Sequence, residues 1–406
     1  MTDGGNEAGV RRVTDLDYSA PLPDSDPDIV AKIGAEIRSG GPMTLARFME
    51  LALYDPERGY YTRAPDAPGL AGAAPPTGPG REGDFLTAPE GHPIFGWSVA
   101  RHLASTWDAL DRPVRFVVRE HGAGTGAMAA GILDGLRRDG SPLLEAIRYQ
   151  AIEASPARLD GLQDRLAEQG LAGLLESATD RPEEGAILAN ELLDALPVHR
   201  VEGGANGDLL ESFVTVNEAG AFSTVLAPAS TEALAARLEA EQIHLAPGQP
   251  AEICLSLDDW LATAAAPLAR GSVLLIDYGY PATELYRPDR GSTLRAYHRH
   301  RVHADPFAAM GRQDLTAHVD LTAVERAAAA AGLDGLGRTT QATFLSDLGA
   351  GELLVALQSE PGITLERYLA ARSALVRMLD PRATGAFAVL AFGRGMPSGT
   401  KLRGLP

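Results

Sequence analysis

Apolar and polar residues follow different periods along the chain, and these periods divide it into regions. From 29 to 53 the apolar residues recur every three or four positions, which is the period of amphipathic helices. Gly40-Gly41-Pro42 interrupts this pattern, so we expect two helices, with Thr44 as the N-cap of the second. Residues 1–28 are polar, acidic and rich in proline, which predicts a disordered tail.

The middle of the chain alternates short apolar runs with stretches of helical period. The predicted strands are 114–120, 149–153, 173–177, 186–190, 272–277 and 387–392. The predicted helices are 127–138, 156–169, 232–243, 257–268, 321–331 and 364–379. Over 198–225, apolar and polar residues alternate around two glycine-containing turns, which predicts an antiparallel ribbon. Strands that alternate with helices indicate a mostly parallel sheet with right-handed crossovers.

The sequence therefore predicts an α/β protein with an N-terminal helical extension and an inserted ribbon with helices. We expect a tail over 1–28, a helical and loop region that contributes to the cleft over 29–110, a Rossmann-like core over 111–200 and 270–395, an insertion over 201–269 and a short tail over 396–406. The Pro/Gly/Ala-rich stretch 64–81 is predicted to be a loop, and a lid is one hypothesis for its role.

Composition excludes several protein classes. An apolar share of 45% over 406 residues is typical of globular proteins. The chain has no run near the roughly 18 apolar residues of a membrane helix, so no membrane span is expected. A single cysteine, Cys254, excludes an internal disulfide and a cysteine-cluster metal site. Together with an acidic N-terminus unlike a signal or transit peptide, it favours a cytoplasmic location.

Charge narrows the choice of partners. A net charge of −18 argues against nucleic acid, because binding to a phosphate backbone relies on Lys and Arg. An acidic surface is compatible with a basic protein substrate, although such charge most often serves solubility. The histidines show no pair with the spacing of metal ligands, so no metal site is predicted.

The run Glu120-His121-Gly122-Ala123-Gly124-Thr125-Gly126 carries the clearest chemical signal. It follows a predicted strand and precedes a predicted helix. Glycines there let the backbone turn sharply and approach a ligand closely, and the helix N-terminus offers free amides. On its own, this pattern fits a methyl-donor loop, a nicotinamide fingerprint or a purely structural turn.

Three neighbouring features favour a binding site for S-adenosyl-L-methionine. The spacing is Gly-x-Gly-x-Gly and not the Gly-x-Gly-x-x-Gly of dinucleotide binders. Glu120 stands before the first glycine, as an acid usually does in methyl-donor loops. Glu153 ends the next predicted strand, where a carboxylate can accept hydrogen bonds from both ribose hydroxyls. The candidate cofactor-binding residues are Glu120, Gly122, Ala123, Gly124, Gly126, Glu153, Ala154 and Asn190.

The fourth predicted strand ends in Asn190-Glu191, and Asp194 follows it. In an open α/β sheet the carboxyl ends of the strands face the ligand crevice, so these polar groups lie where donor and acceptor would meet. The structural alternative is that Asn190 is a turn residue and Asp194 an N-cap. Neither a P-loop nor a Gly-x-Ser-x-Gly elbow occurs, which excludes a P-loop nucleotidase and disfavours a serine hydrolase.

Ordered motifs over 29–393 resemble those of the MidA-like methyltransferases. This family includes mitochondrial complex I assembly-factor enzymes that methylate a protein arginine, and many bacterial relatives. The motifs are Leu53-Tyr54-Asp55-Pro56 with Gly59-Tyr60-Tyr61, 83–90, Phe95-Gly96, the glycine loop, Glu153-Ala154-Ser155-Pro156, 190–198, Ile276-Asp277-Tyr278-Gly279, 291–297, 313–320 and 341–345.

The resemblance implies a Rossmann-like class I methyltransferase fold with S-adenosyl-L-methionine as donor. A guanidinium acceptor is charged at neutral pH, so carboxylates must pair with it and take a proton late in the reaction. By resemblance, the candidate catalytic residues are Glu191, Asp194 and Asp84, with Glu191 first. The candidate substrate-binding residues are Phe85, Thr87, Asp277, Tyr278 and His318. For His318, a satisfied structural histidine is the alternative.

Two departures from the family pattern keep the acceptor open. His121 stands where the family usually has an apolar residue, and Gly91-His92-Pro93-Ile94 replaces a run that usually contains serine. Three function classes therefore remain: a protein arginine methyltransferase, a methyltransferase for a small molecule or peptide, and a non-catalytic assembly factor. A homodimer is compatible with the sequence, which does not determine the oligomeric state.

Overall fold

The computed structural model describes residue 22 and residues 24–63, 87–299 and 301–406. Its centre is a six-stranded sheet of order β15-β16-β9-β4-β2-β3. The strands are β2 (Phe116–His121), β3 (Ile147–Ile152), β4 (Glu183–Asn190), β9 (Leu268–Asp277), β15 (Asp334–Thr340) and β16 (Ala388–Arg394). Four neighbouring strands pair in parallel, and β16 runs antiparallel to both β9 and β15. The predicted α/β fold with a mostly parallel sheet is confirmed.

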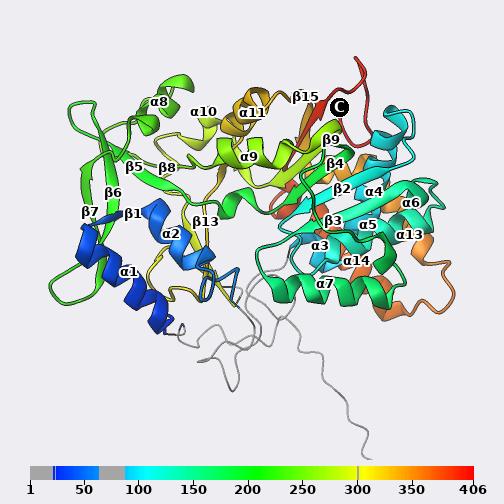
Figure 1. The fold of residues 1–406 in the computed structure, drawn as a ribbon, viewed down its shortest axis with the longest axis horizontal. Coiled ribbons are helices and arrows are strands. Elements are labelled where there is room, and N and C mark those ends of the chain that lie inside the picture. The colour runs from blue at the N-terminus through cyan, green and yellow to red at the C-terminus, as the bar shows by residue number, and fades with distance from the viewer. Residues whose placement is uncertain (1–21, 23, 64–86, 300) are drawn as a thin grey trace, which may run out of the picture.

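Helices cover both faces of this sheet (Figure 1). One face packs against α4 (Ile94–Ala109), α5 (Ala127–Arg138), α7 (Pro156–Glu168), α12 (Gln341–Asp347), α13 (Ala350–Leu357) and α14 (Leu365–Leu379). The other face packs against α9 (Leu257–Ala265) and α11 (Leu321–Ala330). Successive residues of β4 alternate between the two cores: Leu188 lies in the first, and Ile187 and Ala189 lie in the second. Burial on both faces explains why these strands read as continuous apolar runs.

Helices α4 and α5 approach each other unusually closely. A Cβ added at Gly96 would lie 2.6 Å from the Cα of Gly131, and one at Gly135 would lie 2.7 Å from the Cα of Trp97. Gly131 and Gly135 of α5 are therefore contact points between the two helices. This packing fixes α5, whose N-terminus begins at the glycine loop.

Replacing Gly96 with alanine is expected to lower the free energy of unfolding by about 1–3 kcal/mol, because the added methyl group overpacks the crossing. Urea denaturation followed by circular dichroism measures the change. Gly161→Ala on α7 is the matched control, since an added Cβ there has no atom within 4 Å. Alanine is favoured over glycine inside a helix by roughly 0.5–1 kcal/mol, so this control is expected to gain stability. Equal stability of the two variants would contradict the close crossing.

A second sheet forms the other end of the molecule, on the left in Figure 1. Its strands are β1 (Met43–Thr44), β5 (His199–Gly203), β6 (Leu209–Val216), β7 (Phe222–Pro228) and β8 (Pro250–Ile253). The predicted antiparallel ribbon is confirmed in β5 to β7. The sheet is larger than predicted, because β1 from the N-terminal region pairs with β6 and β8 pairs with β5. The helix α8 (Glu232–Ala240) packs beside it.

The N-terminal helices α1 (Pro27–Gly40) and α2 (Leu45–Tyr54) are the two predicted from the sequence. Thr44 caps α2 by accepting a hydrogen bond from the amide of Arg47 at 3.1 Å. Asp26 caps α1, so this helix begins slightly before the predicted start at 29. Both helices share a core with the second sheet, which places the end of α2 beside the central sheet's carboxyl edge.

Shorter elements complete the fold. They are α3 (Ala88–Gly91), α6 (Leu143–Ala146), α10 (Ala282–Leu285), β10 (Gly279–Tyr280), β11 (Arg295–His298), β12 (Arg301–His303), β13 (Asp314–Thr316) and β14 (Val319–Asp320). Within the part of the chain that the structure describes, no helix is both long and apolar enough to span a membrane. Most of the predicted tail over 1–28 and the predicted loop over 64–81 lie outside the described residues.

The predicted strand over 173–177 is wrong. Residues Ala172–Leu174 form a single turn of 3₁₀ helix, and Leu175 makes one isolated parallel bridge to Tyr149. The amides of Leu174 and Leu175 donate back to Leu171 and Ala172, so they are not offered to β3. Only the amide of Glu176 reaches the carbonyl of Tyr149, at 2.8 Å. The sheet therefore ends at β3.

Candidate active site

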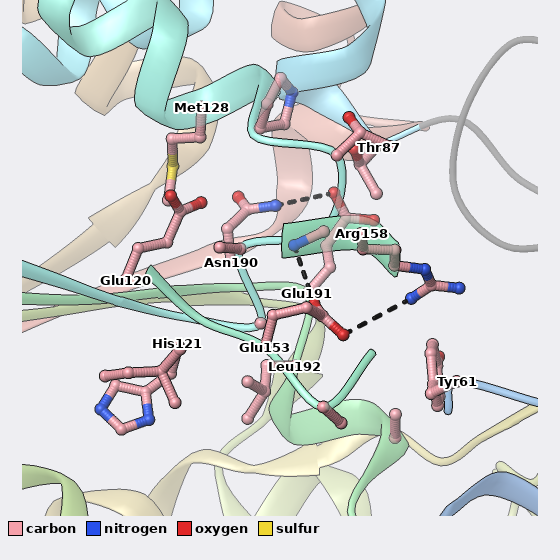
Figure 2. A pocket seen from close by; sticks show the side chains of 18 of the residues that line it. Tyr61, Thr87, Glu120, His121, Met128, Glu153, Arg158, Asn190, Glu191 and Leu192 are labelled. Carbon is pink, nitrogen blue, oxygen red and sulfur yellow. Dashed lines mark hydrogen bonds and ion pairs between the residues drawn. The ribbon is translucent and has the colours of Figure 1, made fainter. Parts of the chain in front are cut away.

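The main cavity opens at the carboxyl ends of β2, β3 and β4 and has a volume of about 250 Å³. Figure 2 shows the side chains that line it. Its walls come from the glycine loop, the ends of the three strands, α3, α9 and the end of α2. This is the crevice in which open α/β sheets bind ligands.

The glycine loop forms the floor of this cavity. Gly122, Gly124 and Gly126 all have positive φ, at 70°, 55° and 77°, so side chains would be strained there. Gly122, Ala123 and Gly124 line the cavity. Gly126 does not line it; a Cβ there would lie 2.5 Å from the Cγ of Leu162 on α7. The third glycine is therefore explained by close helix packing in this structure.

Glu153 stands at the end of β3 with its carboxylate held in place by the backbone. One oxygen accepts a hydrogen bond from the amide of Gly124 at 2.9 Å, and the other from the amide of Ser155 at 3.0 Å. Arg158 lies 3.9 Å from this carboxylate, and the Glu153 side chain is only 6% exposed. Glu153 and Ala154 both line the cavity, beside the glycine loop.

Glu120 and His121 end β2 and lie on opposite sides of the strand (Figure 2). Glu120 is buried and accepts a hydrogen bond from the hydroxyl of Tyr149 at 2.6 Å. Burial raises the pKa of Glu120 to about 8. His121 packs edge-on against Trp260, with ring centroids 5.7 Å apart. Burial lowers the pKa of His121 to about 4, so it is a neutral ring where the family usually has an apolar side chain.

Asn190 and Glu191 end β4 and project into the same cavity. Glu191 has a positive φ of 50°, and its carboxyl accepts hydrogen bonds from the side-chain amide of Asn190 at 3.2 Å and the backbone amide of Ala88 at 3.4 Å. Burial, with Asp194 nearby, raises the pKa of Glu191 to about 8. A non-glycine residue in this conformation is uncommon and is typical of functional sites.

Asp194, Asp277 and Tyr278 lie behind this loop and do not line the cavity. One carboxylate oxygen of Asp277 accepts hydrogen bonds from three consecutive amides, Leu192, Leu193 and Asp194, at 2.8–3.3 Å. Asp194 in turn accepts a hydrogen bond from the Tyr278 hydroxyl, and burial raises the pKa of Asp194 to about 6. In this structure the predicted catalytic Asp194 and the predicted substrate residues Asp277 and Tyr278 support the loop that carries Glu191.

The other predicted residues divide between three places. His318 packs against Tyr278, with ring centroids 5.4 Å apart, and lines a smaller, separate cavity. Thr87 lines the main cavity near Glu191. Asp84 and Phe85 lie outside the described residues.

Replacing Asp277 with asparagine is expected to destabilise the fold by about 1–3 kcal/mol, because one oxygen becomes an NH₂ group that faces backbone amides. Thermal denaturation measures the loss. Asp289→Asn is the control, since Asp289 is exposed and forms a surface ion pair with Arg287. An unchanged melting temperature for Asp277→Asn would show that the three amide contacts do not hold the loop.

Several residues that line the cavity were not predicted as site residues. They are Tyr54, Tyr61, Pro89, Glu90, His121, Thr125, Ala127, Met128, Ile152, Arg158, Leu192, Ala195 and Trp260. Tyr54 and Tyr61 lie in one of the motifs that carry the family resemblance. Membership of this motif was the signal that could have marked them as site residues. Arg158 and Trp260 had no such signal. Each is a single residue on a helix, and only the packing of that helix shows whether its side chain points into the cavity.

Residues 98–339 match the sequence profile of a family described as "Putative S-adenosyl-L-methionine-dependent methyltransferase". The matched range includes the glycine loop, Glu153, Glu191 and β9. The chain belongs to this methyltransferase family.

Relatives of this methyltransferase agree with the assignment. The mitochondrial protein arginine methyltransferase NDUFAF7 of Mus musculus is 30% identical over 355 residues, which cover 80% of this chain and 75% of the mouse protein. The NDUFAF7 protein of Homo sapiens is 28% identical and covers 81% and 75%. A crystal structure from Burkholderia thailandensis, bound to S-adenosyl-homocysteine, has a TM-score of 0.80 and 34% identity, covering 93% of this chain and 97% of that chain. The resemblance to MidA-like enzymes is confirmed.

The chain is thus an S-adenosyl-L-methionine-dependent methyltransferase, and the cavity suits this cofactor. The side-chain oxygen of Asn190 is buried and has no hydrogen-bond partner among the described residues. It lies in the same cavity as the carboxyls of Glu120 and Glu153. These acceptors match a ligand that carries ribose hydroxyls, an ammonium group and a sulfonium charge.

Proposed function

We propose that this methyltransferase transfers the methyl group to a guanidinium nitrogen of an arginine in a protein. The observation that carries the proposal is Glu191: a cavity-lining carboxyl, held in a strained backbone conformation, at the strand end beside the glycine loop. The mouse and human relatives are named protein arginine methyltransferases, which supports the same acceptor.

In this proposal the cofactor lies across the glycine loop. Glu153 accepts hydrogen bonds from the ribose hydroxyls, and Ala154 lies beside the adenosine. Gly122, Ala123 and Gly124 allow the backbone to approach without side-chain obstruction. Glu120 and Asn190 offer acceptors to the amino-acid part of the cofactor. The cofactor supplies a methyl group on a positively charged sulfur, which makes that methyl group electrophilic.

The protein's contribution is then to orient the acceptor and to receive a proton. A guanidinium group is charged and has no free lone pair until a proton leaves the attacking nitrogen. In this proposal Glu191 pairs with the guanidinium and accepts that proton as the N–C bond forms and the S–C bond breaks, with S-adenosylhomocysteine as the leaving group. The acceptor's positive charge stabilises the ionised form of Glu191, which lowers its pKa in the complex. Alignment within the cavity supplies a large part of the rate gain, roughly 7–11 kcal/mol for well-oriented reactants.

The alternative of a small-molecule or peptide acceptor rested on the unusual run 91–94. All four of these residues are described, and none lines the main cavity. His92 instead packs edge-on against Trp97, with ring centroids 5.7 Å apart. This departure from the family pattern therefore gives no reason to prefer a small molecule. The expected cytoplasmic location and the homodimer stay predictions.

The test is methylation of a peptide library by the purified enzyme with S-adenosyl-L-methionine, read by tandem mass spectrometry. The library holds one central residue, arginine, lysine or citrulline, within randomised flanks that contain neither arginine nor lysine. Methylation confined to the arginine peptides, and lost in Glu191→Gln, is the expected result. Methylation of lysine at a comparable rate, or of none of the three, would contradict the proposed acceptor.

A further inference from the structure

The motif Leu53 to Tyr61 builds a rigid turn that ends at the cavity. One oxygen of Asp55 accepts hydrogen bonds from the amides of Glu57 and Arg58, at 3.2 and 3.1 Å. The other oxygen pairs with Lys32. A Cβ added at Gly59 would lie 2.5 Å from the amide nitrogen of Asp55, so the turn closes without space for a side chain.

This turn sets two tyrosine rings side by side. Tyr54 and Tyr61 stack with their ring centroids 5.5 Å apart and their planes 24° from parallel, and both line the main cavity. The Tyr54 hydroxyl donates to the carbonyl of Ala195 at 3.0 Å, and the Tyr61 hydroxyl donates to Asp314 at 2.6 Å. Because both hydroxyl protons are used within the protein, neither hydroxyl donates to a ligand, and a ligand meets the aromatic rings and the acceptor oxygens.

The surroundings of these rings favour a cation. The acidic side chain of Glu191 lines the same cavity, and the electron-rich face of an aromatic ring attracts cations. Glu153 lines it as well, but its charge is already paired with Arg158 at 3.9 Å. Tyr61 already has a guanidinium near it: the Arg158 guanidinium carbon is 5.7 Å from the Tyr61 ring centroid. Figure 2 shows Arg158 between Glu153 and Tyr61. A planar guanidinium is therefore a suitable partner for the Tyr61 ring in the main cavity.

We propose that Tyr54 and Tyr61 form an aromatic wall that binds the guanidinium of the substrate arginine while Glu191 pairs with its nitrogens. This inference rests on the proposed arginine methyltransferase function and adds the residues that select the acceptor. The wall holds the guanidinium plane fixed, so that one nitrogen faces the methyl donor. Selectivity follows from shape and charge, since a neutral ureido group has the same shape but lacks the cation–π attraction.

The probe is methylguanidinium, added to the full-length enzyme saturated with S-adenosylhomocysteine and followed by saturation-transfer NMR. Wild type is expected to bind the probe, and Tyr61→Leu and Tyr54→Leu are expected to bind it at least about tenfold more weakly. Tyr61→Phe keeps the ring and loses only the hydroxyl, so it is expected to bind more tightly than Tyr61→Leu. Methylurea, the neutral analogue, is expected to bind wild type no better than it binds Tyr61→Leu.

Tyr280→Leu is the matched control. Tyr280 also carries a guanidinium on its ring, with Arg290 at 3.6 Å, but it lies outside the main cavity. It is expected to change neither probe binding nor the affinity for S-adenosylhomocysteine. Thermal denaturation of every variant shows whether a loss of binding reflects a loss of fold.

Three results would overturn the aromatic wall. They are absence of probe binding to wild type, equal binding by the leucine variants and wild type, and leucine variants that lose cofactor affinity while keeping the probe, which would assign the rings to the adenosine. None of these depends on turnover. If wild type binds methylguanidinium through these rings but methylates no arginine peptide, the proposed function fails while the cation site stands.

Discussion

The Glu153→Ala variant is expected to bind S-adenosyl-L-methionine at least about a hundredfold more weakly than wild type. Removing the carboxylate deletes two charge-assisted hydrogen bonds to the ribose, each worth about 1.5–3 kcal/mol. The geometry supports this size of effect, because the amides of Gly124 and Ser155 already hold both oxygens in place before the cofactor arrives. Isothermal titration calorimetry with S-adenosyl-L-methionine measures the change.

Two further variants separate the role of Glu153 in cofactor binding from its role in the folding of the glycine loop. Glu153→Gln keeps the shape and one acceptor oxygen but loses the charge, so it is expected to lie between wild type and the alanine variant. Glu168→Ala, on the exposed end of the same helix α7, is expected to bind like wild type. A dissociation constant for Glu153→Ala within threefold of wild type would remove Glu153 from the cofactor site.

The glycine-loop side of this cavity was predictable because its signals are local. A strand, a glycine loop and a helix follow one another in the sequence, and the acid of the next strand has a fixed position in parallel sheets. The structure therefore places Gly122, Gly124 and Glu153 together as the motif implied. Gly126 is different: its nearest neighbour is Leu162 on α7, and this contact exists only after the helices pack.

The acceptor side could be predicted only in part. Asp194 and Asp277 were correctly placed near the strand ends, but the direction of each side chain depends on the loop between them. Asp277 accepts hydrogen bonds from three backbone amides of that loop, so its carboxylate lies behind the cavity instead of inside it. Tyr54 and Tyr61 lie more than fifty residues before the glycine loop, and only the tertiary fold shows that they share its cavity.

The edge strands of the central sheet were also only partly predictable from the sequence. The strand β15 has little apolar pattern of its own and contains Gly335 and Gly337, with a register shift between them. It forms because β16 offers a complete antiparallel partner over Asp334 to Thr340. The run 173–177, by contrast, has a stronger apolar pattern, but the amides of Leu174 and Leu175 donate hydrogen bonds within a 3₁₀ turn. Whether a segment forms an edge strand depends on the strand that it pairs with, and the sequence alone does not identify that partner.

The Glu191→Gln variant is expected to lose about 10²–10⁴-fold in kcat, with the affinity for S-adenosylhomocysteine little changed. The size is that of a missing general base, because glutamine keeps the shape but cannot accept the proton. Radiometric or mass-spectrometric turnover of an arginine peptide, with calorimetry of the cofactor in parallel, measures both quantities. A wild-type kcat in this variant would remove Glu191 from the chemistry.

The pH dependence of wild type gives an independent test of the same residue. The pKa of Glu191 is raised to about 8, so below this pH the free enzyme holds mostly the protonated carboxyl, which cannot accept a proton. Values of kcat/KM are therefore expected to rise about tenfold per pH unit up to about 8 and then level off, because kcat/KM reports the free enzyme. Since a bound guanidinium favours the carboxylate, the corresponding rise in kcat is expected at lower pH.

Glu120 is the necessary comparison, since burial raises its pKa to about 8 as well and it lines the same cavity. If Glu191 is the proton acceptor, Glu191→Gln loses the rise in kcat/KM, while Glu120→Gln keeps it and instead weakens cofactor binding. If the rise persists in Glu191→Gln and disappears in Glu120→Gln, the titrating group is Glu120. In that case the carboxyl at the end of β4 would serve only to pair with the acceptor, and the proton would leave by another path.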